Sequence, residues 1–223
     1  MLTDFYDNLT ERLRGAGDWL APLGLRLLLA HEFWKAGVLK LRDPNGNVSG
    51  FHANLDFPFP FGHFPDALNF FLVTWGEILA AIALVLGLFT RFFAFTLIVI
   101  TIVAIASVHW PASWDSLGQL WQGYSVSRVI EDGEFRGNFR IPMLFLAMLM
   151  PLFFMGAGKL SLDHLLLQLT GRAGLIEQRN ADAKAFAIAL TLFGLMAIYL
   201  ITLWGVFLLL AAVALFGYVW LQR

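Results

Sequence analysis

Ionisable side chains stand inside the first long apolar run of this chain, where they could form ion pairs or handle a substrate. Arg26, His31, Glu32 and Lys35 all lie within the segment LRLLLAHEFWK. A charge near the centre of a bilayer is costly, so such groups normally face a partner and often mark substrate, ion or proton paths. Two interpretations stay open for these residues: structural ion pairing, or a site for a substrate, protons or quinone.

Helical geometry separates these side chains. At about 100° per residue, His31 and Lys35 share a face and Glu32 lies about 60° from Lys35, whereas Arg26 points the opposite way. The second apolar run adds Glu77, for which Arg26 and Lys35 are both candidate partners. We therefore expect a working site between the first two helices, beneath the aromatic loops. The full candidate polar site comprises Arg26, His31, Glu32, Lys35, Glu77, His109 and Arg140.

Histidines raise a second kind of chemistry, because imidazole binds Cu, Zn and Fe. The candidate metal ligands are His31, His52, His63 and His109. Their spacing matches no compact ligand motif, so hydrogen-bonded histidines at the membrane interface are the plainer interpretation. The chain has no Cys, which excludes disulfides, thiolate metal sites and thiol nucleophiles. No cofactor motif is evident; copper and quinone remain the candidates.

The elements that position these residues are predicted to be membrane helices. The chain is 59% hydrophobic and 14% charged, whereas soluble domains average about 45–50% apolar and about 25% charged residues. This composition predicts an all-α, polytopic membrane helix bundle in contact with lipid. The net charge of −1 argues against nucleic acid as a partner, since such binding calls for a strongly basic surface.

Apolar runs locate the spans, because a helix needs about 20 residues to cross the hydrocarbon core. Helices are predicted near residues 20–41, 67–89 and 92–108, followed by a fourth from 141 that ends at 155 or continues towards 169. The uncharged run 185–221 is too long for one span. It predicts a hairpin that turns near Thr202 to Gly205, for about six spans in all.

The remaining segments predict how the chain is divided and oriented. Residues 1–18 form an amphipathic interfacial helix that Gly15 and Gly17 end, 19–171 form the membrane core, 172–184 a cytoplasmic linker and 185–223 the hairpin. The Pro- and Phe-rich loop 42–65 is expected to pack as a cap, and the Trp-rich loop 109–138 to lie at the interface. Lys and Arg in the flanks predict that both termini are cytoplasmic.

Several motifs carry a family resemblance. Arg26 with HEFWK at 31–35, Glu77 followed by GLFTR at 87–91, and GAGKLSLD at 156–163 resemble the DoxX family of small bacterial membrane proteins. Within that family, WGE at 75–77, the run from TIVAIA at 101–106 into VHWP at 108–111, and GNF at 137–139 resemble the HvfX-type branch. That branch is associated with gene clusters for copper-binding, ribosomally synthesised and modified peptides.

The resemblance implies a four-helix core to which the C-terminal hairpin is an addition. It also implies an accessory protein for the maturation, export or metal handling of a copper-binding peptide, with the peptide precursor and its modifying enzymes as partners and no catalysis of its own. The alternative is a membrane subunit of a quinone-linked oxidoreductase, in which Arg26, Glu77 and His109 would bind quinone oxygens beside a redox partner. A small-solute transporter is weaker, since no internal repeat is evident.

Overall fold

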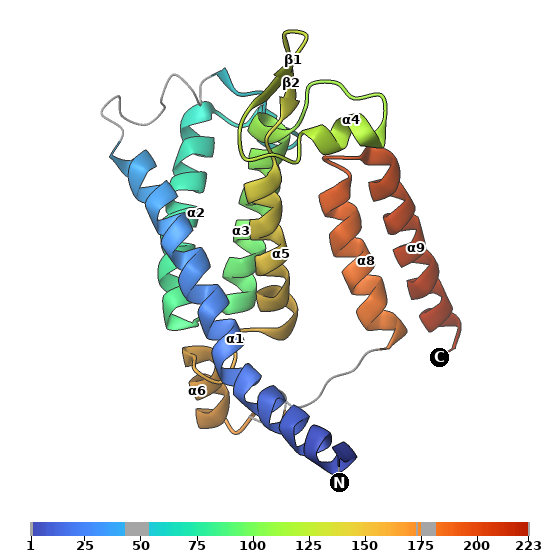
Figure 1. Ribbon diagram of the computed structural model, residues 1–223. Helices are drawn as coiled ribbons and strands as arrows, with labels where there is room; N and C mark the ends of the chain where they lie inside the picture. The colour runs from blue at the N-terminus through green and yellow to red at the C-terminus, as the bar shows by residue number, and fades with distance from the viewer. Residues whose placement is uncertain (1, 43–53, 173, 175–181, 223) are drawn as a thin grey trace. The chain divides into compact units, whose positions relative to one another are not determined.

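The computed structural model describes residues 2–42, 54–172, 174 and 182–222, and most of these are helical (Figure 1). Contacts divide the chain into two units, which are described separately. The core unit contains residues 1–55, 63–101 and 141–173; the second unit contains 56–62, 102–140 and 174–223. The helical membrane bundle predicted from composition is confirmed.

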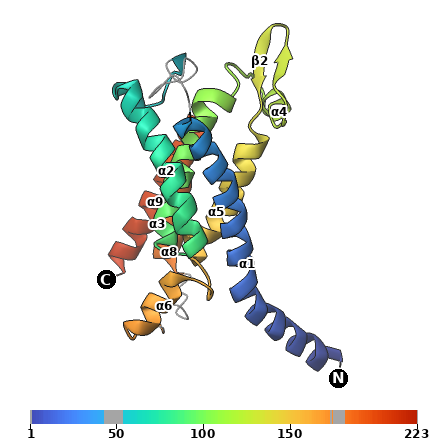
Figure 2. The ribbon, with the colours of Figure 1, turned by 90° about the vertical axis from the view of Figure 1, so that its left-hand side faces the viewer.

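Helix α1 is one continuous helix, Leu2–Leu41, and Figure 2 shows it running without a break from the N-terminus. The predicted end at Gly15 and Gly17 is therefore wrong. A glycine inside a helix costs only about 1 kcal/mol relative to alanine, which neighbouring turns can offset. Nor does Pro22, which lies inside α1, end the helix. The amphipathic start and the apolar run with its ionisable residues are thus parts of one helix.

Helix α2, Asp66–Leu86, and helix α3, Thr90–Ala104, follow, and both lie in the core unit except for the last three residues of α3. Their junction is tight because Gly87 adopts a left-handed φ of 63° and its N–H caps the end of α2. Beyond Ala104 the helix continues into the second unit as the π-helix Ile105–His109. There the N–H of Trp110 donates to the carbonyl of Ile105 at 2.8 Å.

Helix α5, Arg140–Met155, does not continue towards residue 169. The chain leaves it through Gly156 and Gly158, at φ 87° and 77°, conformations that suit glycine and break a helix. A separate helix α6, Leu162–Leu169, then begins with Ser161 as its N-cap. The prediction that allowed one long fourth helix is corrected to two helices in this region.

The second unit contains short elements and the C-terminal hairpin. The elements are the 3-10 helix Phe61–His63, which begins in this unit, α4 at Leu117–Gln122, β1 at Val129–Glu131, β2 at Glu134–Gly137, α8 at Ala183–Ala197 and α9 at Thr202–Leu221. The strands pair antiparallel and were not anticipated. Helices α8 and α9 pack on each other, and their turn precedes Thr202, a few residues earlier than predicted.

Three described helices are long and apolar enough to cross a membrane: Asp66–Leu86, Thr90–His109 and Thr202–Leu221. Helices α5 and α8 are apolar but shorter. Helix α1 has the length, but Arg26, Glu32, Lys35 and Lys40 interrupt its apolar part. The buried side chains of the core unit include Leu29, Phe33, Ala81, Leu84, Leu97, Ile98, Leu149 and Leu152. How many times the chain crosses stays a prediction.

Candidate functional site

An ion pair joins the end of α1 to the middle of α2. Lys40 Nζ lies 2.9 Å from Glu77 Oε1 and 2.7 Å from Oε2. The side chains are only 20% and 7% exposed, respectively. Sequence reasoning offered Arg26 and Lys35 as partners of Glu77, and neither is correct. The pair removes the net charge that Glu77 would otherwise bring into an apolar helix.

Gly37 sets the close approach that this pair needs. A Cβ at Gly37 would lie 2.7 Å from Ile78 Cγ1 and 3.2 Å from the Thr74 carbonyl oxygen. Those atoms belong to α2, so only glycine lets the two backbones come this near without a shift. Gly37 precedes Lys40 by about one turn. The small residue and the ion pair therefore form one helix–helix junction.

Arg26 forms a second junction towards the other end of α2. Its side chain is fully buried, and Nη1 donates to the carbonyls of Leu84 at 3.0 Å and Val85 at 3.3 Å, while Nη2 donates to that of Leu160. The last four carbonyls of a helix lack intrahelical donors and carry partial negative charge. Arg26 thus caps α2 and ties it to the segment 156–163.

Asp163 completes this junction, and sequence reasoning did not single it out. Its carboxylate accepts the N–H groups of Phe89 at 2.7 Å and Thr90 at 2.9 Å, at the start of α3. Its own N–H donates to the carbonyl of Gly87 at 2.9 Å. A carboxylate at a helix N-terminus is stabilising. The GLFTR and GAGKLSLD motifs, which lie far apart in sequence, therefore meet.

His31, Glu32 and Lys35 take no part in these junctions. His31 and Lys35 are exposed and Glu32 is half-buried. Within the part of the chain that the structure describes, none of the three side chains has a hydrogen bond or an ion pair. His31 borders a groove of about 310 Å³ between α1 and α2, whose lining comprises Leu27, Ala30, His31, Trp34, Ala81, Ile82, Val85 and Leu86.

His109 lies in the second unit, where it contacts a distant loop segment. Its Nδ1 lies 2.9 Å from Asn138 Oδ1, and its carbonyl accepts the Asn138 N–H at 3.0 Å. The rings of Trp110 and Phe139 are 4.9 Å apart between centroids. The VHWP and GNF motifs thus pack together. Arg140, at the start of α5, is exposed, and its backbone N–H donates to the carbonyl of Ser125.

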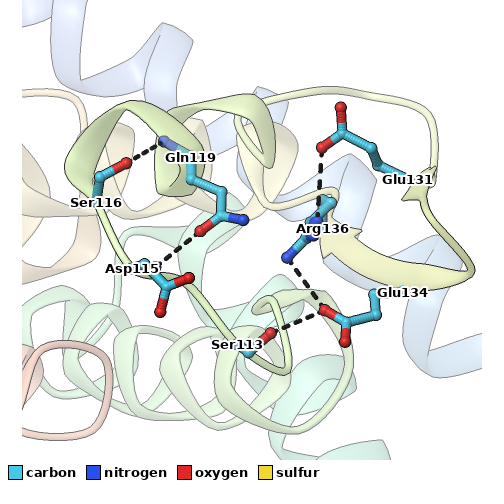
Figure 3. Close-up of polar contacts among 7 residues, drawn as sticks. All are labelled: Ser113, Asp115, Ser116, Gln119, Glu131, Glu134 and Arg136. Atoms are coloured by element: carbon cyan, nitrogen blue, oxygen red, sulfur yellow. Dashed lines mark hydrogen bonds and ion pairs between the residues drawn. The ribbon is translucent and has the colours of Figure 1, made fainter.

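The charged tip of the same loop is held by its own side chains (Figure 3). Arg136 lies between Glu134, at 3.1 Å, and Glu131, at 3.7 Å. Ser113 donates to Glu134 at 3.0 Å, which joins the hairpin to the start of the loop. Arg136 is buried although both carboxylates are exposed. The charged tip of this loop is therefore ordered by contacts among its own side chains.

The histidines are not gathered into a metal site in the described part of the chain. Among those residues, no group of three or more His, Cys, Asp or Glu side chains could hold a metal ion. His52 lies outside the described residues. A stable metal site needs several converging ligands. The described donors therefore do not fit a resident metal.

The family model described as DoxX matches residues 21–110 of this chain. An uncharacterized protein of Haemophilus influenzae is 31% identical over 157 residues, which are 70% of this chain and 89% of that relative. No solved structure matches the chain. The matched region contains the Lys40–Glu77 junction, Arg26 and the GLFTR motif, and it ends at Trp110.

Proposed function

Since the chain belongs to the DoxX family of membrane proteins, we propose that it is an accessory protein for maturation, export or metal handling of a copper-binding modified peptide. In this role it binds a client and its partners and performs no catalysis itself. The contacts of the buried charges support a role without catalysis. Lys40 and Glu77 pair with each other, and Arg26 donates to backbone carbonyls.

The contact between the VHWP and GNF motifs is the observation that carries this proposal. These are the motifs that resemble the HvfX-type branch, and His109–Asn138 and Trp110–Phe139 bring them together. Binding residues often lie on loops that a scaffold positions, and His109, Trp110 and Asn138 are each partly exposed. The family resemblance implies a location in the bacterial inner membrane, and in the predicted topology the loop would meet the peptide on the outer side.

A peptide-production experiment tests the proposal. The peptide precursor and its modifying enzymes are expressed with the wild-type protein, without it, or with Asn138→Leu. We expect at least a several-fold loss of modified, copper-loaded peptide outside the cell in the last two cases, measured by mass spectrometry and elemental analysis. Gln119→Leu is the matched control, because Gln119 lies in the same loop and its side-chain oxygen accepts the backbone N–H of Asp115, away from the motif contact. Unchanged peptide without the protein would exclude this function.

The groove on α1 and α2 favours a second function, a membrane subunit of a quinone-linked oxidoreductase. Its volume of about 310 Å³ is at the lower end of ligand sites, about 300–1,000 Å³. His31 is its one ionisable lining residue and could donate to a quinone oxygen. Arg26 and Glu77 are already engaged by other groups, so His31 replaces them in this hypothesis.

Lipid extraction separates the two functions. If the second holds, the purified protein carries a stoichiometric quinone, and His31→Leu lowers its amount at least fivefold. His164→Leu is the control, since His164 lies in α6 and bonds Gln168. Quinone at the level of the surrounding lipid in all three proteins would exclude this second function and leave the first untouched.

A further inference from the structure

One stripe of α1 carries two opposite charges for which the described part of the chain offers no partner. The side chains of Glu32 and Lys35 form no hydrogen bond or ion pair with any described residue. Exposed Leu28 and Leu39, at 50% and 71%, lie on either side of them along the helix. The four positions are spaced four, three and four residues apart, which places them on one face of the helix.

This stripe lies at the depth of apolar α2. Arg26 contacts the carbonyls of Leu84 and Val85, and Lys40 contacts Glu77, so Glu32 and Lys35 fall between these two levels. The groove confirms the depth, because His31 and Trp34 border it together with Ala81 and Ile82. Ala81 lies about 7.5 Å before the C-terminal end of α2, at 1.5 Å per residue, and therefore inside the apolar span. Facing lipid there would be unfavourable for both charges.

The C-terminal hairpin cannot neutralise these charges. The run 185–221 contains no Asp, Glu, Lys, Arg or His, so α9 and the part of α8 beyond Lys184 offer only apolar, small and hydroxyl-bearing side chains. Packing the hairpin over the stripe would bury Glu32 and Lys35 without a counter-ion, which is more costly than leaving them at a surface. A partner that satisfies the stripe must itself carry one acid and one base at matching depth.

We propose that this stripe of α1 is the interface with a second copy of the chain, in which Glu32 of each copy pairs with Lys35 of the other. A two-fold interface must be self-complementary, and an acid and a base on one face meet that condition. With both copies inserted in the same direction, Glu32 and the partner's Lys35 differ in depth by about 4.5 Å, which a lysine side chain spans. The interface is independent of the proposed client.

Exposed small residues extend the same stripe towards the N-terminus. Ala21 lies on this face and is exposed, and a Cβ at the exposed Gly24 would meet no atom within 4 Å. Small residues let membrane helices approach closely. The stripe therefore combines a region of close backbone approach with a pair of complementary charges about two to three turns further along.

Charge reversal tests the interface, with two differently tagged copies expressed together in one membrane. Glu32→Lys gives a copy with two bases on the stripe, and Lys35→Glu gives a copy with two acids. We expect each variant alone to lose at least tenfold of the co-purification shown by wild-type copies. Mixing the two variants should restore it to within about twofold of wild type, because both pairs re-form between unlike copies.

Controls separate this result from misfolding and from other partners. Glu11→Lys reverses an exposed charge on the same helix outside the apolar run, and it should leave co-purification unchanged. If Glu32→Lys does not insert, Glu32→Gln with Lys35→Gln should still weaken self-association several-fold. The proposal is overturned by a monomeric wild type, by unweakened association of either charge variant, or by failure of the mixed copies to recover. A stoichiometric complex with a different membrane protein, without self-association, overturns it equally.

Discussion

At the scale of single residues, three side chains hold the core unit together, and each does so by satisfying a group that would otherwise be unpaired in an apolar setting. Glu77 is neutralised by Lys40, the last carbonyls of α2 by Arg26, and the first N–H groups of α3 by Asp163. Without water to replace them, lost hydrogen bonds are costly in such surroundings.

The Lys40–Glu77 pair should therefore be sensitive to removal of either partner. We expect Glu77→Gln or Lys40→Met to lower the free energy of unfolding by about 3–5 kcal/mol, because one buried charge is left uncompensated. The double change Lys40→Met with Glu77→Leu should recover most of that loss. Denaturant unfolding of the purified protein measures it. Glu131→Gln, at a pair whose carboxylate is exposed and lies 3.7 Å from Arg136, should cost less than about 1 kcal/mol, and equal losses at both sites would contradict this account.

Asp163 gives a prediction about local order. Asp163→Ala removes two acceptors from the start of α3 and should cost about 0.5–2 kcal/mol, the usual range for a helix N-cap. Hydrogen exchange should accelerate at the N–H groups of Phe89 and Thr90. Asp182→Ala, which removes the N-cap of α8, should accelerate exchange at Ala185 only. Unchanged exchange at α3 would show that Asp163 is not its cap.

At the scale of elements, the apolar runs were predictable and their ends were not. Hydropathy located α2, α3, α5 and the C-terminal hairpin, because each must bury its backbone polar groups within a helix. Gly15 and Gly17 did not end α1, since a helix tolerates glycine at modest cost. Gly156 and Gly158 did end α5, because there the chain adopts positive φ. Composition alone does not distinguish these two uses of glycine.

Partner choice between elements was also beyond the sequence. The sequence predicts Arg26 or Lys35 as the ion-pair partner of Glu77, whereas the structure shows Lys40 in that place. The difference depends on how far α1 extends beside α2, which the Gly37 approach decides. The sequence predicts a loop over 109–138 but not the strands that order its charged tip, because strands this short leave little alternating pattern.

The helix approach at Gly37 can be tested by adding one methyl group. Gly37→Ala should lower the free energy of unfolding by about 1–3 kcal/mol, since the new Cβ would overlap Ile78. Gly15→Ala should instead raise it by up to about 1 kcal/mol, because a Cβ at Gly15 meets nothing. Thermal unfolding in detergent compares the two variants, and a neutral Gly37→Ala would contradict the close packing.

At the scale of the whole molecule, the family and the membrane class are established, while orientation remains a prediction from the distribution of Lys and Arg. The full chain has no Cys, so single cysteines introduced by substitution can report the orientation of the chain in the membrane. Glu11→Cys and Asp182→Cys should react with a membrane-impermeant thiol reagent only after the cells are opened. Asp132→Cys, in the loop, should react in intact cells. The reverse pattern would place both termini outside.

The π-helix at Ile105–His109 affects which side chain contacts the loop that follows it. A π turn contains one residue more than an α turn, so it rotates the side chains at its C-terminal end by about 100° about the helix axis. That rotation is part of the backbone path that presents His109 to Asn138. The count of residues in this turn, more than their chemistry, therefore decides which side chain meets Asn138. A relative lacking a single residue here would present another group.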